Sequence, residues 1–146
     1  MSIRISESVA GPSGYDPPPL LEAMGHDSET LKCTVKRLSD SAAILSLAGE
    51  IDLATANKVA HCFQQLADEE TTRVLIDATE VTFIDSSGLH AFIEGKRLMY
   101  DLDCRIVLVP SRQMRRLLEI VFPEPLFAAR VDSIEEGLAV LNSDNS

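Results

Sequence analysis

The chain has 146 residues, of which 45% are hydrophobic and 25% charged, a balance typical of one soluble globular domain with a tail. Its formal net charge of −10 argues against duplex nucleic acid and anionic membrane surfaces as partners, because both attract Lys and Arg. The charge suits a basic protein partner, although plain solubility explains it equally well.

Residues 1–29 differ in composition from the rest of the chain. They are rich in proline and glycine, which form neither strands nor helices readily, and we expect a flexible N-terminal arm. One short apolar patch in this arm, Leu20–Met24, could dock locally. A folded domain is predicted over residues 30–142, followed by a frayed end at 143–146.

From residue 31 onward, the hydrophobic pattern predicts strands and helices in the order β-β-α-β-α-β-α-β-α. The first two strands read as an antiparallel hairpin closed by Ser39–Ser41, and we expect Gly49 to end the second. The helices start at hydroxyl or carboxylate caps. The predicted strands are 31–38, 43–48, 73–77, 105–109 and 127–131; the helices follow Asp52 or Thr55, Asp85–Gly88, Ser111 and Ser133, with the first ending near 68 and the last near 141.

This alternation of strands and helices predicts an α/β fold. Strands joined through helices run parallel with right-handed crossovers, whereas the opening hairpin is antiparallel. The expected sheet is therefore mixed.

The three cysteines, Cys33, Cys62 and Cys104, are too few and too widely spaced for a disulfide framework or a zinc motif. We expect them to be reduced core thiols of a cytoplasmic protein. Redox control through Cys62 and Cys104 is the alternative, and the fold decides which thiols could meet. No signal peptide or membrane-spanning run is recognisable, which also favours the cytoplasm.

The most informative segment is Asp85-Ser86-Ser87-Gly88, which follows a buried strand and opens a helix. Free backbone N–H groups at a helix N-terminus favour hydroxyl and carboxylate caps and can receive anions. Gly88 permits close approach of the backbone. Read from the residues alone, Asp85 or Ser86 is a helix N-cap.

Three segments resemble the STAS domain family, and specifically its bacterial anti-sigma factor antagonists. They are Phe83–Leu89, Leu47–Asp52 and Val74–Asp77, and the resemblance extends over about 31–141. It implies a single STAS domain whose mixed sheet carries its helices mainly on one face.

The resemblance also implies a phosphorylation switch. Ser86 would be phosphorylated by an ATP-dependent GHKL-type serine kinase that is itself the anti-sigma factor. The unphosphorylated chain would bind this kinase and release a sigma factor, and a metal-dependent Ser/Thr phosphatase would reset the switch. The implied partner-binding residues are Asp52, Asp85, Ser86, Ser87, Gly88 and His90. No cofactor, metal or catalytic residue is implied, and we expect a monomer or weak dimer.

His90 departs from the family pattern, which commonly has glycine at this position. It lies four residues after Ser86 and so shares a helix face with it. One interpretation is an exposed helix histidine. The other is a side chain that adjusts partner choice or makes the contact pH-sensitive.

Three other functions compete with this interpretation. A hydrolase using Ser86 and His90 would need an orienting third group and an oxyanion hole, and the chain has no Gly-x-Ser-x-Gly motif. A non-switching STAS scaffold could serve a stress-signalling or transporter complex. A degenerate antagonist could bind its partner constitutively. The chain has no Gly-rich phosphate loop, so any nucleotide would belong to the partner.

Overall fold

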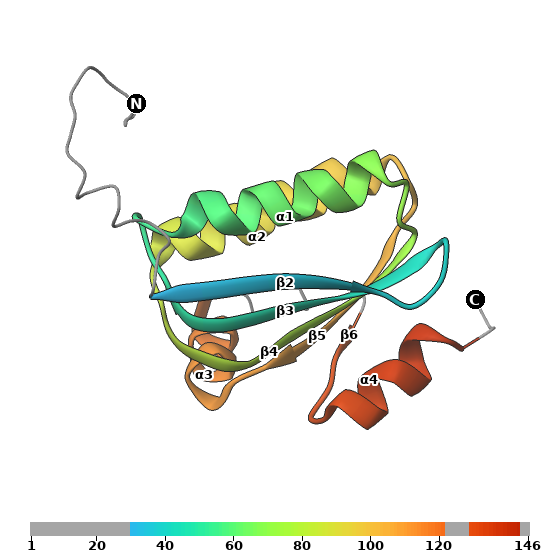
Figure 1. Cartoon of the computed structure of the whole chain (residues 1–146). Helices are drawn as coiled ribbons and strands as arrows, with labels where there is room; N and C mark the ends of the chain where they lie inside the picture. The colour runs from blue at the N-terminus through green and yellow to red at the C-terminus, as the bar shows by residue number, and fades with distance from the viewer. Residues whose placement is uncertain (1–29, 122–128, 144–146) are drawn as a thin grey trace, which may run out of the picture. The chain divides into compact units, whose positions relative to one another are not determined.

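The computed structural model describes residues 30–121 and 129–143, and they contain one five-stranded sheet (Figure 1). The predicted arm, its Leu20–Met24 patch and the last three residues lie outside the described part. Neighbouring strands follow the order β2-β3-β4-β5-β6. Their bounds are β2 Leu31–Arg37, β3 Ala42–Ile51, β4 Arg73–Ile84, β5 Arg105–Pro110 and β6 Ala129–Arg130.

The sheet is mixed, as predicted. Strands β2 and β3 pair antiparallel, and the three remaining pairs are parallel. The side-chain oxygen of Ser39 accepts hydrogen bonds from the backbone N–H groups of Ser41 and Ala42, both at 3.2 Å. This local bonding closes the hairpin turn where the sequence placed it.

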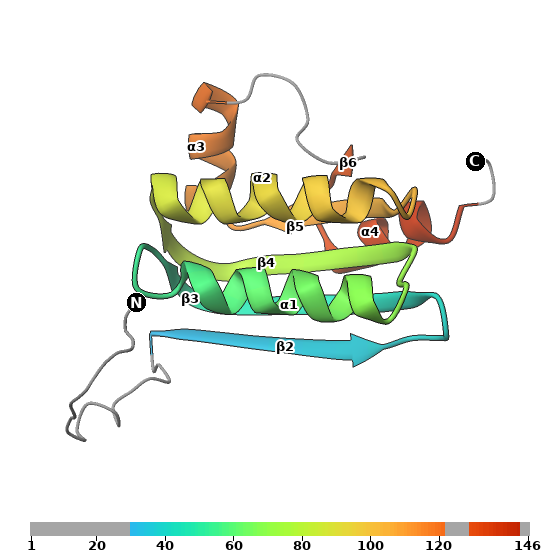
Figure 2. The same cartoon turned by 90° about the horizontal axis from the view of Figure 1, so that it is seen from above.

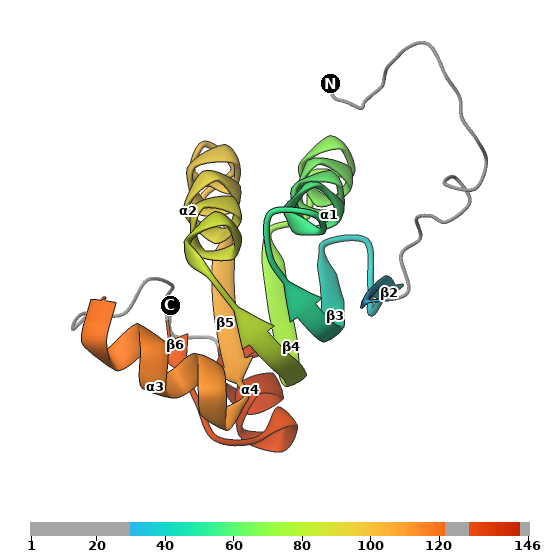
Figure 3. The same ribbon diagram turned by 90° about the vertical axis from the view of Figure 1, so that its left-hand side faces the viewer.

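Four helices accompany the sheet in the described residues. Figure 2 and Figure 3 show α1 and α2 side by side on one face, with α4 on the opposite face. The helices are α1 Ala56–Asp68, α2 Ser86–Tyr100, α3 Arg112–Val121 and α4 Ile134–Leu141. Helices α1, α2 and α3 all contribute side chains to the larger core cluster.

The central strand β4 separates two hydrophobic clusters because its side chains alternate between the faces of the sheet. Val74 and Ile76 belong to the larger cluster, and Leu75 belongs to the smaller one beneath α4. Within the larger cluster, the rings of Phe63 (α1) and Phe92 (α2) meet edge to face, with centroids 6.1 Å apart. This aromatic contact joins the two helices.

Strands β3 and β4 are longer than the sequence predicted. β3 continues past Gly49 to Ile51, and β4 continues past Asp77 to Ile84. The two strands remain paired in parallel over this longer span, with two register shifts in the pairing. Gly49 adopts a φ of 119° at one of these shifts. The predicted end of this strand at residue 77 is therefore wrong, because the strand itself carries the chain to the start of the next helix.

The predicted caps of α3 and α4 are confirmed. Ser111 Oγ accepts from the N–H of Met114, and Ser133 Oγ accepts from the N–H of Glu136, both at 3.1 Å. The Glu136 carboxylate bonds the N–H of Asp132, one residue earlier than in a standard capping box. These short polar contacts set where both helices begin.

Candidate functional site

The candidate site is the junction between β4 and α2. Here the ends of two paired strands lie side by side, with Ile51 of β3 opposite Ile84 of β4. The backbone N–H of Asp85 donates to the Ile51 carbonyl at 3.2 Å. The loop that follows β3 is therefore held directly beside the start of α2.

Asp85 is the N-cap of α2. Its backbone is extended, and its Oδ1 atom accepts hydrogen bonds from the N–H groups of Ser87 at 2.9 Å and Gly88 at 3.1 Å. A carboxylate at a helix N-terminus is also favoured by the helix dipole. Of the two caps that the sequence allowed, Asp85 fills the role, and it already occupies these two N–H groups.

Ser86 is the first residue of α2 and is exposed. Within the described residues, its hydroxyl has no side-chain hydrogen bond to another protein group. Ser87 is half-buried beside it. An exposed hydroxyl at the start of a helix is accessible to a modifying enzyme.

Gly88 is buried where α2 passes close to β3. A Cβ at this position would lie 2.8 Å from both the carbonyl oxygen and the Cγ2 of Ile51, and 2.8 Å from Ile84 Cγ1. The absence of a side chain therefore permits the close approach that the sequence suggested.

Asp52 organises the neighbouring loop between β3 and α1. Its Oδ1 accepts from the N–H groups of Ala54 at 3.0 Å and Thr55 at 3.1 Å, and Thr55 Oγ1 donates to the Glu50 carbonyl at 2.7 Å. Thr55 occupies the N-cap position of α1 without a side-chain cap bond. Asp52 thus shapes the loop, and Thr55 ties it to β3.

His90 lies on the exposed surface of α2, one turn after Ser86. Its Nε2 is 3.8 Å from Glu94 Oε2, and its side chain is 70% exposed. Glu94 is also bound by Arg97 at 2.8 Å. An exposed helix position is compatible with both interpretations of His90.

Two exposed apolar side chains at this junction were not recognised as site residues from the sequence. Leu53 in the Asp52 loop is 80% exposed, and Phe83 near the end of β4 is 48% exposed. Phe83 pairs with Glu50, so both side chains come from the segments that meet at Asp85. The sequence signal was present, since Phe83 belongs to the motif, but a strand phenylalanine is normally assigned to the core.

The cysteines are arranged differently from the pair considered from the sequence. The thiols of Cys62 on α1 and Cys33 on β2 each shift the pKa of the other, raising that of Cys33 and lowering that of Cys62. Cys104 is separate: its thiol donates weakly to the Arg105 carbonyl at 3.7 Å, and burial raises its pKa to about 12. All three are free and half-buried.

Two further features bear on function. Across residues 30–121 and 129–143, no group of three or more His, Cys, Asp or Glu side chains is arranged to hold a metal ion. No helix in these same ranges has the length and apolar character needed to cross a membrane.

Asp85→Ala is expected to destabilise the domain by about 1 kcal/mol, because two N–H groups of α2 lose their acceptor. Asp85→Asn is the matched control, since its side-chain oxygen preserves the cap. Urea unfolding of both variants checks this. Equal losses for both would show that the charge, rather than the cap, stabilises the junction.

Gly88→Ala is expected to cost about 1–3 kcal/mol of stability, despite the better helix propensity of alanine, because the backbone oxygen of Ile51 cannot easily move away. Ser87→Ala, at the half-buried neighbouring position, should stay within about 0.5 kcal/mol of wild type. Urea unfolding measures both. A Gly88→Ala variant as stable as wild type would contradict the close packing.

Comparison with known proteins identifies the family and the fold of this domain. Residues 34–121 match the family model described as "Mlab, STAS domain". The chain therefore belongs to the STAS domain family. Curated relatives include the anti-sigma-B factor antagonist of Listeria monocytogenes, which is 36% identical over 75 residues. That match covers 51% of this chain and 66% of the relative, just under two thirds of its length.

Solved structures share the fold at low sequence identity. An anti-sigma factor antagonist from Mycobacterium paratuberculosis gives a TM-score of 0.65 at 19% identity, covering 77% of this chain and 95% of that one. The Bacillus cell fate determinant SpoIIAA in its phosphorylated form gives 0.59 at 18% identity, covering 75% and 98%. The predicted family and fold class are confirmed.

Proposed function

We propose that this protein is an anti-sigma factor antagonist that acts by binding. In its unphosphorylated form it binds an anti-sigma factor and releases a sigma factor, and phosphorylation of Ser86 ends this binding. The single observation that carries the proposal is the exposed Ser86 hydroxyl at the start of α2 in a STAS domain related to anti-sigma-B factor antagonists.

The charges around Ser86 support a switch. Asp85 caps the helix, and the Asp52 loop is held against the same junction. A phosphate adds about −1.5 to −2 charges at neutral pH. Asp85 already occupies two N–H groups at the helix end, so the phosphate would extend from the surface and add negative charge to the face that meets the partner.

The exposed apolar side chains support a docking surface at the same place. Leu53 and Phe83 flank the junction, and apolar anchors beside charged groups are typical of protein interfaces. We propose that they contact the anti-sigma factor together with Asp52, Asp85, Ser86, Ser87, Gly88 and His90.

The remaining parts of the proposal concern the partners. We infer that the anti-sigma factor is a GHKL-type serine kinase, that a metal-dependent Ser/Thr phosphatase removes the phosphate, and that the chain works in the cytoplasm as a monomer or weak dimer. SpoIIAA supports the switch by analogy, since it has this fold and its structure is known in a phosphorylated form.

The test is affinity capture from the native bacterial lysate with wild type and Ser86→Ala as baits, followed by mass spectrometry. A captured kinase is then purified and incubated with the chain and ATP, and the phosphosite is mapped. We expect a kinase on both baits, one phosphate on wild-type Ser86 and none on Ser86→Ala.

Two outcomes would contradict the proposal. Capture of a partner that does not phosphorylate Ser86 would favour the non-switching scaffold or the constitutive antagonist. Phosphorylation at another residue would move the switch away from the β4–α2 junction.

A further inference from the structure

We propose that Cys33 and Cys62 form a reversible intramolecular disulfide when the chain meets a hydroperoxide. The two thiols belong to different elements, the edge strand β2 and helix α1, and are 29 positions apart in the sequence. Both are half-buried and pack against the larger core cluster, so they are held by the fold while remaining accessible to a small oxidant.

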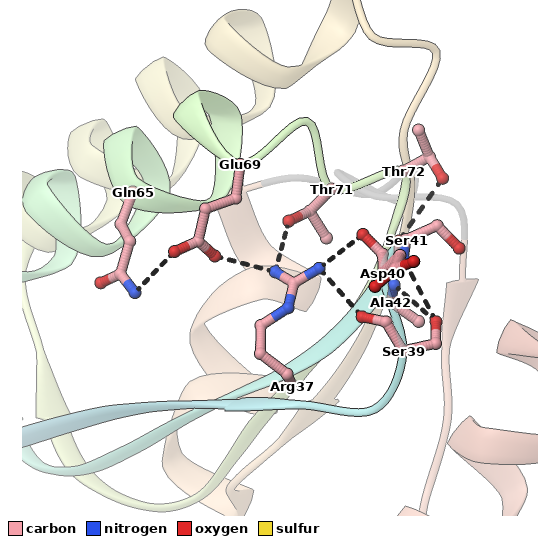
Figure 4. A network of polar contacts seen from close by, with 9 residues as sticks. All are labelled: Arg37, Ser39, Asp40, Ser41, Ala42, Gln65, Glu69, Thr71 and Thr72. Carbon is pink, nitrogen blue, oxygen red and sulfur yellow. Dashed lines mark hydrogen bonds and ion pairs between the residues drawn. The ribbon is translucent and has the colours of Figure 1, made fainter.

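Two contacts on either side of the cysteines hold α1 alongside β2. On the N-terminal side of both cysteines, Lys58 Nζ donates to the Leu31 carbonyl. On their C-terminal side, Arg37 Nη1 donates to Glu69 Oε1 at 2.9 Å (Figure 4). Helix and strand run in the same direction, as Figure 2 shows.

The spacing between these contacts brings the two thiols together. From Lys58 to Cys62 the helix rises by about 6 Å, since four residues advance 1.5 Å each. From Leu31 to Cys33 the strand advances by about 6.6 Å, and residues two apart share a face. Cys62 therefore lies opposite Cys33, in agreement with the interaction between their side chains.

Further hydrogen bonds of Arg37 support this register. The guanidinium also donates to Thr71 Oγ1 at 2.8 Å and to the carbonyl oxygens of Ser39 and Asp40 at 3.1 and 2.9 Å (Figure 4). Arg37 thereby joins the hairpin turn, the end of α1 and the start of β4. The guanidinium N–H groups of Arg37 therefore hold these three parts of the fold together.

The two thiols are chemically unequal. A hydrogen bond from Cys33 and the nearby positive charge of Lys58 lower the pKa of Cys62, against the opposing effect of burial. The interaction with Cys62 and burial raise the pKa of Cys33. Cys62 is thus the attacking thiolate and Cys33 the resolving thiol.

The reaction proceeds in two steps. The Cys62 thiolate attacks one peroxide oxygen; the O–O bond breaks, and Cys62 becomes a sulfenic acid while the other oxygen leaves and is protonated. The Cys33 sulfur then attacks the sulfenic sulfur, the S–O bond breaks, and water leaves with the thiol proton. Two thiols and one hydroperoxide give one disulfide, one alcohol (water from hydrogen peroxide) and one water, and a dithiol reverses the product.

The test counts free thiols in the full chain. The reduced protein is treated with one equivalent of hydrogen peroxide, blocked with N-ethylmaleimide and measured by intact mass and peptide mapping. We expect three adducts before oxidation and one afterwards, on Cys104, with dithiothreitol restoring all three. Cys104→Ser is the matched control, and its two adducts should fall to none.

Several results would overturn the proposal. Three adducts after peroxide would show that no disulfide forms. A Cys62–Cys104 linkage, a disulfide-linked dimer, or Cys62 accumulating as sulfinic acid with Cys33 still alkylated would each show that Cys33 is not the resolving thiol. The wild-type count requires no substitution, so a variant that fails to fold cannot obscure the answer.

Discussion

Ser86→Glu is expected to bind the anti-sigma factor about 100-fold more weakly than wild type, a loss of about 2.8 kcal/mol. The added carboxylate lies beside Asp85, where the helix N–H groups are already taken, and it must be desolvated on docking. Ser86→Ala should bind like wild type, because the hydroxyl makes no side-chain hydrogen bond within the described residues. Titration calorimetry with the captured partner measures all three affinities.

Ser143→Glu is the matched control for this experiment. It makes the same chemical change at an exposed position whose carbonyl accepts from Arg105, at the start of β5 and thus at the opposite end of the parallel strands from the candidate site. We expect its affinity to equal that of wild type and both variants to unfold at similar urea concentrations. Equal losses for Ser86→Glu and Ser143→Glu would show that net charge, and not a local switch, controls binding.

Phe63→Ala is expected to destabilise the domain by about 3–5 kcal/mol, a large part of the roughly 5–15 kcal/mol typical of such domains. The ring is fully buried between α1 and α2, where it meets Phe92 edge to face. Its removal leaves a cavity between the two helices that flank the candidate site. Urea unfolding at low temperature measures the loss, and Leu53→Ala, which truncates an 80% exposed side chain, should stay within about 0.5 kcal/mol of wild type.

Gly95→Ala tests the same contact from the other helix. A Cβ at Gly95 would lie 2.4 Å from Phe63 Cδ2, so in the wild-type background this substitution should cost about 1–3 kcal/mol. In the Phe63→Ala background the cost should disappear, because the obstructing ring is absent and alanine is the better helix former. Additive losses in the double variant would show that Gly95 does not support the Phe63 ring.

The candidate site was partly predictable. Asp85-Ser86-Ser87-Gly88 was placed at a strand-to-helix junction because its local chemistry is that of a helix start, and Asp85 does cap α2. The proximity of Asp52 came from family resemblance and not from the residues themselves, since it depends on the pairing of Ile51 with Ile84. The exposure of Leu53 and Phe83 also depends on how the two segments meet.

The sequence by itself determined the order of strands and helices, the hairpin and the caps at Ser111 and Ser133, because these depend on contacts within a few residues. Only the tertiary structure decided the continuation of β4 past Asp77, because bulges in its pairing with β3 override the break in the hydrophobic pattern. It also decided which thiols lie near each other. Cys33 is the neighbour of Cys62 because α1 lies alongside β2, and contacts between residues far apart in the sequence establish that position.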